Sequence, residues 1–285
     1  MPRITLRKTA RLEGVGVHTG KASAITLAPG EPGGGIVFVS GGTRITATVE
    51  NVSSSDRRTD ISSGGETVMT VEHILSALFG MGVDDATITV DGPEIPFLDG
   101  SALPIAKAIA DAGTDEVPGE PEHIAVDEEM TMRFGDTAFR LYPLENLELS
   151  CRITYNHPFI REQGIKFTIT PGTYLGEIAP ARTYIFQEEA QEILSRGLGK
   201  GGSLDCVLVI TTEGYMNEPR FQDEPVRHKL ADMIGDLALA GARLSMGIEA
   251  TRPGHRTNHA LAGFLRKKRV TGVSPEKSGE WGHGL

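Results

Sequence analysis

The stretch V-R-H-K-L-A-D-M-I-G-D-L-A-L-A-G-A, residues 226–242, is the part of the sequence that decides the fold. Its apolar residues recur at helical spacing, and Pro225 just before it is typical of a first helical turn. Because little of its surface is polar, we expect this helix to be buried. His228, Asp232 and Asp236 follow at intervals of four residues and therefore share one face of the helix.

Two interpretations of this polar face are open. A buried histidine or aspartate must be hydrogen-bonded, paired with an opposite charge or bound to a metal, because leaving it bare costs several kcal/mol, roughly. The side chains of His228 and Asp232 could bond to neighbouring backbone, which is the commoner arrangement for an isolated His-x-x-x-Asp motif. They could instead bind one cation together.

A second copy of the motif favours the interpretation that these side chains bind a cation. The segments V-E-H-I-L-S-A-L-F-G (71–80) and V-R-H-K-L-A-D-M-I-G (226–235) share the pattern V-x-H-x-L-x-x-[L/M]-x-G, so His73 corresponds to His228. The order of strand-like and helix-like segments around them is also repeated. A fold made by duplication would place the two helices as pseudo-symmetric partners, with both histidines at the seam.

The chain therefore divides into two similar α+β domains. Glycine-punctuated, alternating segments predict a sheet at the start of each half, and helices follow. The predicted divisions are a first domain at 1–113 with a polar insert at about 51–65, a linker at 114–121, a second domain at 122–270 with an insert at about 155–170, and a flexible tail at 271–285.

Composition excludes several classes of protein. The 285 residues are 39% hydrophobic and 23% charged, which is typical of a globular protein, and the net charge of −10 argues against a nucleic-acid surface. No apolar run approaches the roughly 20 residues that cross a bilayer, and no secretory signal is visible. We therefore expect a cytoplasmic monomer without an integral membrane segment. Cys151 and Cys206 are expected to be buried free thiols.

The three side chains His73, His228 and Asp232 would suit zinc. Two nitrogens and one oxygen leave a tetrahedral zinc one position for water, whose pKa falls from about 15.7 to near 7. Glu72, next to His73, could act as the base. On local evidence alone, Glu72 could equally be an acidic partner of the positive end of its helix.

If the activated water attacks an amide, the leaving nitrogen also needs a proton donor. His255 lies in a glycine-proline turn just before the last predicted helix, which suits such a role. His255 and His259 are themselves four residues apart and form a rival metal pair. We rank that pair second, because neither histidine has an adjacent carboxylate.

Six motifs together closely resemble the UDP-3-O-acyl-N-acetylglucosamine deacetylases of lipid A biosynthesis. The likeness runs in order from the loop G-V-G-V-H-T-G to about Leu265, so it covers nearly the whole chain. The motifs are T-V-E-H-I-L-S-A-L, D-G-P-E-I-P-F-L-D-G-S-A, A-R-T-Y-I-F, K-G-G-S-L-D-C, V-R-H-K-L-A-D-M-I-G-D-L and G-H-R-T-N-H.

The resemblance implies a fold in which helices are sandwiched between the sheets of two similar domains, each with one small insert. It also implies zinc-dependent removal of the N-acetyl group as acetate, the committed step of lipid A biosynthesis. The roles it implies are zinc ligands at His73, His228 and Asp232, general base at Glu72, acid or electrostatic partner at His255, orientation of His255 by Asp236, oxyanion contact at Thr183, and contact with substrate phosphates or developing charge at Lys229.

The sequence departs from the family at positions that affect acyl recognition. Tyr184 stands where phenylalanine is usual after A-R-T, and the first insert carries adjacent Arg57 and Arg58. The acyl length and the choice between zinc and iron stay open. Two alternatives are a zinc amidase of the same fold acting on another acylated nucleotide sugar, and a non-catalytic nucleotide-sugar or nucleic-acid binding module.

Overall fold

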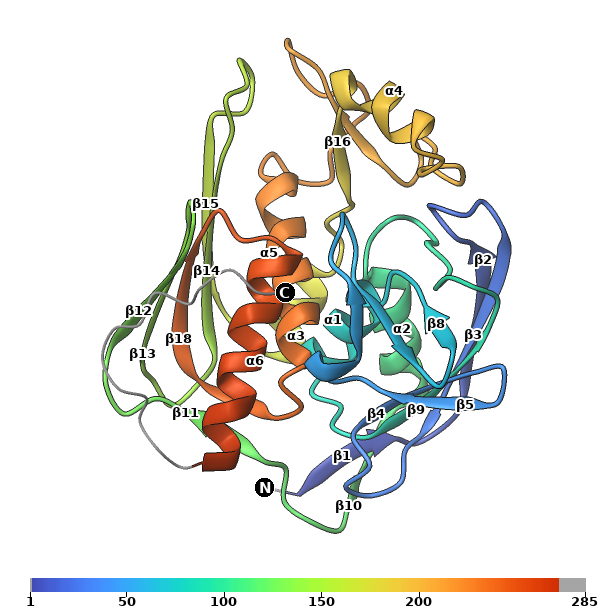
Figure 1. Ribbon diagram of the computed structural model, residues 1–285, viewed down its shortest axis with the longest axis vertical. Coiled ribbons are helices and arrows are strands. Elements are labelled where there is room, and N and C mark those ends of the chain that lie inside the picture. Colours follow the sequence, from blue (N-terminus) through green and yellow to red (C-terminus); the bar gives the residue numbers. More distant parts are fainter. Residues whose placement is uncertain (1, 272–285) are drawn as a thin grey trace.

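The computed structural model describes residues 2–271, and most of its helical residues lie between two sheets (Figure 1). The first sheet has the strand order β2-β3-β9-β4-β5. Its strands are β2 (Ala10–Val15), β3 (Ala22–Pro29), β4 (Ile36–Ser40), β5 (Thr43–Thr46) and β9 (Ala86–Asp91).

The second sheet has the order β12-β13-β18-β14-β15, with β11 pairing in parallel with β18. Its strands are β11 (His123–Ala125), β12 (Met130–Phe134), β13 (Thr137–Pro143), β14 (Glu148–Thr154), β15 (Glu162–Thr168) and β18 (Arg243–Thr251).

The two sheets are built alike. In the first, β9 pairs antiparallel with β3 and parallel with β4; in the second, β18 pairs antiparallel with β13 and parallel with β14. In each case the last strand of the half enters between two earlier ones, as a duplication predicts. The predicted α+β class, with helices between two sheets, is confirmed.

Alternation along the strands explains why each sheet has one covered face. In β9, Ala86, Ile88 and Val90 are buried, whereas Thr87 and Thr89 between them point the other way. Such a period of two places apolar side chains on the core side and polar ones toward solvent. The core therefore lies between the sheets, where the helices fill it.

Four helices occupy that space: α1 (Glu72–Gly80), α2 (Leu103–Ala112), α5 (Glu224–Ala238) and α6 (His255–Thr271). Helices α1 and α5 pack against each other. A side-chain carbon at Gly235 of α5 would stand 2.0 Å from the carbonyl oxygen of Glu72, so only glycine permits this approach. The two helices that carry the repeated motif are thus in backbone contact.

The predicted linker is partly wrong. Residues 114–117 form strand β10 (Thr114–Val117), which pairs antiparallel with β1 (Arg3–Leu6). The connection is polar because the strand lies on the outside of the molecule, not because it lacks structure. The domain boundaries themselves stay predictions.

The second insert was also placed wrongly. Residues 162–168 are strand β15, which pairs with β14 at the edge of the main sheet, and every second residue there is exposed. That exposed face made an edge strand resemble a polar insert. The segment that extends away from the second sheet is instead β16 (Tyr184–Phe186), α4 (Gln187–Ser195) and β17 (Leu208–Ile210) (Figure 1).

The first predicted insert, at about 51–65, contains β6 (Val52–Ser54) and β7 (Asp60–Ser63), which form a small sheet with β8 (Glu66–Val68) just beyond it. Short helical turns complete the chain at η1 (Val49–Asn51), α3 (Pro171–Thr173) and η2 (Tyr174–Ile178). Cys151 and Cys206 are free and buried, as predicted. Within residues 2–271 no helix is long and apolar enough to cross a membrane. The predicted tail lies outside the described residues, except Thr271, which ends α6.

Candidate metal centre

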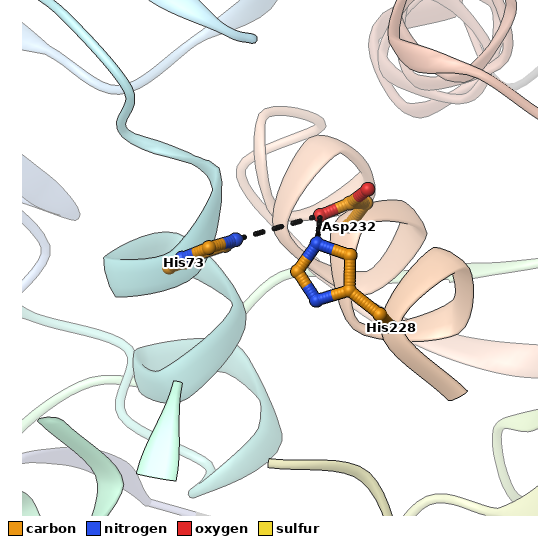
Figure 2. Close-up of side chains that lie close together, drawn as sticks. All are labelled: His73, His228 and Asp232. Atoms are coloured by element: carbon orange, nitrogen blue, oxygen red, sulfur yellow. Dashed lines mark ion pairs between the residues drawn. The ribbon is translucent and has the colours of Figure 1, made fainter. Parts of the chain in front are cut away.

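The structure brings the three predicted metal ligands together across the contact of α1 with α5 (Figure 2). One ligand atom from each of His73, His228 and Asp232 lies within 4.8 Å of the others, and all three residues are buried. Asp232 Oδ1 is 3.3 Å from His228 Nε2 and 3.7 Å from His73 Nε2. Such spacing fits one cation, because tetrahedral ligand atoms about 2.0–2.1 Å from zinc lie about 3.4 Å apart.

The protonation of the two histidines also fits a metal. His228 Nδ1 is 3.1 Å from the carbonyl oxygen of Ala181, which can only accept a hydrogen bond, so Nε2 is left free as a ligand. Burial lowers the pKa of His228 to about 4, which keeps the ring neutral. Burial also acts to lower the pKa of His73, but Asp232 and Glu72 outweigh it and raise that pKa. A cation would take the place of that proton.

Asp232 supplies the negative charge of the group. Burial would raise its pKa, but His228, Lys229 and His73 outweigh that effect and lower the pKa well below its ordinary value. Lys229 Nζ lies 2.9 Å from Asp232 Oδ2, whereas the other oxygen, Oδ1, faces His73 and His228. The carboxylate is therefore anionic and has one oxygen directed at the candidate metal position.

Glu72 lies beside this group without belonging to it. Among the described residues, the set that could hold a metal contains its neighbour His73 but not Glu72. The residue is 4% exposed, and its Oε2 accepts a hydrogen bond of 2.9 Å from the backbone N–H of Thr59. Burial is the main cause that raises the pKa of Glu72. A carboxyl group of raised pKa next to a metal position suits proton transfer.

His255 also lies near this centre. It is the first residue of α6, not part of the preceding turn as predicted. Its Nδ1 lies 2.9 Å from Asp236 Oδ2, and its Nε2 lies 4.0 Å from Asp232 Oδ2. Burial lowers the pKa of His255, but Asp236, Asp232 and Glu72 outweigh this and raise it to about 9. The ring is thus protonated at neutral pH.

The rival pair of His255 and His259 does not share a metal position. His259 Nε2 lies 3.0 Å from Asp236 Oδ1, and its Nδ1 lies 3.0 Å from Ser55 Oγ. Each ring therefore contacts a different oxygen of the Asp236 carboxylate, His255 at Oδ2 and His259 at Oδ1. No third ligand completes a group around them among the described residues.

Comparison with known proteins identifies the family of this chain. A family model described as UDP-3-O-acyl N-acetylglycosamine deacetylase matches residues 3–267. The chain belongs to this family. A relative from Geobacter sp. (strain M21), named UDP-3-O-acyl-N-acetylglucosamine deacetylase, is 39% identical over 270 residues, which cover 93% of this chain and 88% of the relative.

Two further relatives carry the same name. One from Anaeromyxobacter dehalogenans (strain 2CP-C) is 38% identical over 261 residues, covering 90% of this chain and 85% of the relative. One from Nautilia profundicola is 34% identical over 284 residues, covering 98% of this chain and 97% of the relative. Every candidate site residue of this family member lies inside the range that the family model matches.

The candidate centre opens into a cavity of about 580 Å³. Glu72, Thr183, Lys229 and His255 line it together with the three candidate ligands. Much of the remaining wall is apolar and comes from β16, α4 and β17 and the loop before β17: Ile185, Phe186, Ala190, Ile193, Leu194, Leu204, Val207 and Val209. The cavity thus has a polar inner end and an apolar wall.

Polar contacts at the cavity wall involve the positions where the sequence departs from the family. The hydroxyl groups of Tyr184 and Tyr155, both lining the cavity, are hydrogen-bonded to each other. Arg57 Nη1 of the first insert lies 3.3 Å from Glu189 Oε2 of α4. The first insert and the β16–α4–β17 segment therefore meet at the cavity.

Sequence reasoning missed two buried residues of the site region. Glu94 is fully buried and accepts hydrogen bonds from the backbone N–H of His18 and Thr19 and from the hydroxyl of Thr70. It thereby holds the glycine loop at the cavity wall. Thr59 is likewise fully buried, within a stretch that reads as a polar surface loop. Their partners are distant in the sequence, so no local signal could have found either one.

Proposed function

We propose that this protein removes the N-acetyl group of UDP-3-O-acyl-N-acetylglucosamine by hydrolysis and releases acetate, as a step of lipid A biosynthesis. The observation that carries the proposal is the convergence of His73, His228 and Asp232 beside Glu72 in a cavity with an apolar wall. Membership of the deacetylase family and the names of the relatives support the same substrate.

The donor set of two imidazole nitrogens and one carboxylate fits Zn²⁺ and leaves a coordination position open, unlike structural zinc sites, which close with four ligands. Bound there, Zn²⁺ would lower the pKa of water to about 7 and polarise the acetyl carbonyl. Iron(II) accepts the same ligand types, so the metal used in the cell is a separate question.

Two side chains move protons in this proposal. Glu72 takes a proton from the attacking water as the carbon–oxygen bond forms. His255, held by Asp236 and protonated at neutral pH, donates a proton to the nitrogen as the carbon–nitrogen bond breaks. The products are acetate and the free amine.

Other residues hold the substrate. Thr183, which lines the cavity, would donate its hydroxyl proton to the oxyanion that develops on the acetyl group. Lys229 supplies positive charge for that oxyanion or for the diphosphate. The apolar wall formed by β16, α4 and β17 accommodates the 3-O-acyl chain. The predicted cytoplasmic location and monomeric state stay predictions.

The test is acetate release from UDP-3-O-(3-hydroxyacyl)-N-acetylglucosamine by purified protein, before and after removal of metal with a chelator. Activity should vanish with the chelator and return with Zn²⁺. The same sugar nucleotide without its 3-O-acyl group is the control, and it should be turned over poorly. Equal turnover of both would favour a deacetylase of another acylated sugar. Binding of the substrate without any acetate release would indicate a non-catalytic binding module.

A further inference from the structure

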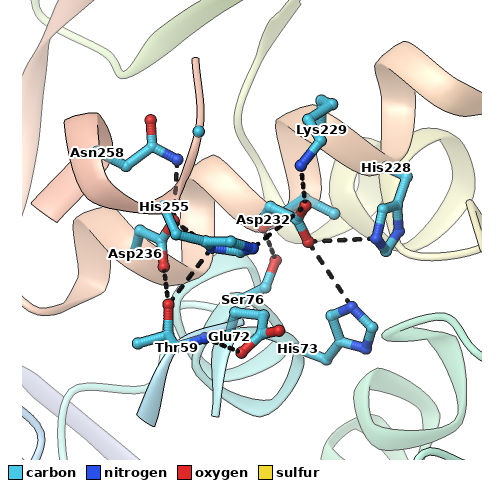
Figure 3. A network of polar contacts seen from close by, with 12 residues as sticks. Thr59, Glu72, His73, Ser76, His228, Lys229, Asp232, Asp236, His255 and Asn258 are labelled. Atoms are coloured by element: carbon cyan, nitrogen blue, oxygen red, sulfur yellow. Dashed lines mark hydrogen bonds and ion pairs between the residues drawn. The ribbon is translucent and has the colours of Figure 1, made fainter. Parts of the chain in front are cut away.

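Thr59 is hydrogen-bonded both to Glu72 and to Asp236 (Figure 3). It lies in the first insert, immediately before β7, and it is 0% exposed. Its backbone N–H donates a hydrogen bond of 2.9 Å to Glu72 Oε2. Its hydroxyl oxygen lies 2.6 Å from Asp236 Oδ1, on a helix 177 residues further along the chain. The proposed base and the residue that holds the proposed acid thus share one neighbour.

The direction of the hydroxyl bond follows from the partners. A carboxylate can only accept, and the charges of His255 and His259 outweigh burial and lower the pKa of Asp236, so that group is ionised. The single proton of the Thr59 hydroxyl therefore goes to Asp236. A length of 2.6 Å is typical of a strong hydrogen bond from a hydroxyl to a charged oxygen. The Thr59 oxygen can still accept from His259 Nε2 at 2.9 Å.

The hydrogen bond from Thr59 connects the first insert to the Asp236 carboxylate. Asp236 Oδ2 lies 2.9 Å from both His255 Nδ1 and Asn258 Nδ2, and Oδ1 lies 3.0 Å from His259 Nε2. Those three partners all belong to α6. Within residues 2–271, the bond from Thr59 is the one hydrogen bond that ties this carboxylate to the insert that precedes α1, the helix that begins with Glu72.

The backbone around Thr59 is firmly held. Its carbonyl oxygen accepts a hydrogen bond of 2.9 Å from the N–H of Val71. The next residue, Asp60, pairs with Arg58 at 2.8 Å and accepts from the N–H of Thr70 at 3.1 Å. The insert is thereby joined to the start of α1 at several points, so the position of the Thr59 hydroxyl is fixed relative to Glu72.

We infer that Thr59 is a positioning residue for the proton transfers: its N–H holds Glu72, and its hydroxyl holds Asp236 and through it His255, at a fixed separation. The inference rests on the proposed function and adds a role for the first insert. Thr59 does not line the cavity, so it has no direct contact with substrate to lose. Loss of its hydroxyl should therefore affect kcat and leave KM nearly unchanged.

The first experiment compares Thr59→Val with Thr59→Ser in acetate release. Valine keeps the shape and the backbone N–H but removes the hydroxyl, and kcat should fall by about 10- to 100-fold, the usual effect of losing a buried hydrogen bond to a charged group. Serine keeps the hydroxyl and should restore most of the activity. Both variants should hold as much zinc as the unaltered protein, because no metal ligand is changed.

Thr137→Val is the matched control. Thr137 is also a buried threonine, and its hydroxyl donates a 2.7 Å bond to the carbonyl oxygen of Arg252, in the second sheet. It does not line the cavity, so its variant should show the general cost of losing a buried hydroxyl without a loss of kcat. If Thr59→Val does not fold, Thr59→Cys supplies a weaker donor of similar size for the same comparison.

The second experiment places Thr59→Val in a His255→Gln background. If Thr59 acts through Asp236 on His255, the valine substitution should cost much less there than in the unaltered protein. An equal loss in both backgrounds, or a Thr59→Val enzyme with normal kcat, would overturn the inference and leave the proposed function standing. Absence of acetate release by the unaltered, zinc-loaded protein would overturn the proposed function, and the inference with it.

Discussion

Replacing Gly235 with alanine tests whether the close approach of α1 and α5 creates the metal centre. The added carbon would stand 2.0 Å from the carbonyl oxygen of Glu72 and 3.1 Å from its Cα, both backbone atoms that cannot rotate away. Ordinary contact needs roughly 3.4 Å or more, so the helices must separate by more than about 1 Å. His73 moves with α1, whereas His228 and Asp232 move with α5.

The magnitude follows from two opposing terms. Alanine improves helix propensity by up to about 1 kcal/mol, whereas overpacking a core costs about 1–3 kcal/mol. For a chain of this length, a net loss of 2 kcal/mol lowers the melting temperature by roughly 3–4 °C. Metal sites tolerate ligand shifts of only about 0.2 Å, so the zinc affinity of the Gly235→Ala protein should fall by at least about 100-fold.

Competition with a chromophoric chelator would measure the zinc affinity, and thermal unfolding of the metal-free protein would measure the stability. Gly263→Ala in α6 is the control, because its added carbon would meet only Val49, at 3.8 Å. That variant should bind zinc normally and be as stable as the unaltered protein or slightly more stable. Normal zinc affinity in Gly235→Ala would refute the argument that the glycine contact sets the ligand geometry.

Three further predictions concern the site and its support. Asp232→Ala should bind little zinc in metal analysis, whereas Glu72→Gln should keep zinc and lose about 10²- to 10⁴-fold in kcat; a metal-free Glu72 variant would show that Glu72 is a ligand. Arg182→Met should lower the free energy of unfolding, measured in denaturant titrations, by about 3–5 kcal/mol. The reason is that the fully buried Glu224 carboxylate would lose the guanidinium that now lies 2.9 Å away. A loss of less than about 1 kcal/mol would contradict this prediction. The pH profile of kcat/KM should be bell-shaped, with activity lost as the pH rises through the pKa of His255. That pKa is about 9 without metal and should be lower beside a bound cation. If the His255→Gln enzyme kept the same loss of activity at high pH, His255 would not be the acid.

Much of the candidate site could be predicted from the sequence because its spacing is local. His228, Asp232 and Asp236 share a helix face whatever the rest of the chain does, since that depends only on the helical period. The repeated V-x-H-x-L motif then added His73 and predicted the pairing of α1 with α5, which the structure contains. The roles of Thr183 and Lys229 came from the family resemblance alone, and the structure places both residues in the cavity wall.

The errors arose where a segment's environment depends on a distant partner. Strand β15 has the composition of an insert because one of its faces is exposed at a sheet edge. Strand β10 has the composition of a linker because it lies on the outside of the molecule, and its partner β1 is too far away in the sequence to reveal the pairing. Thr59 gave no signal for the same reason. Local sequence reports propensity and periodicity, whereas these features are set by pairing between remote segments.

By itself the sequence determined the α+β class, the two matched halves and the candidate metal ligands, because these follow from periodic patterns and a repeated motif. Only the tertiary structure decided which segment extends beside the cavity, and that the first insert reaches both Glu72 and Asp236. It also gave His255 and His259 opposite oxygens of one carboxylate. Such contacts join residues far apart in the chain, and their geometry exists only once both halves have packed.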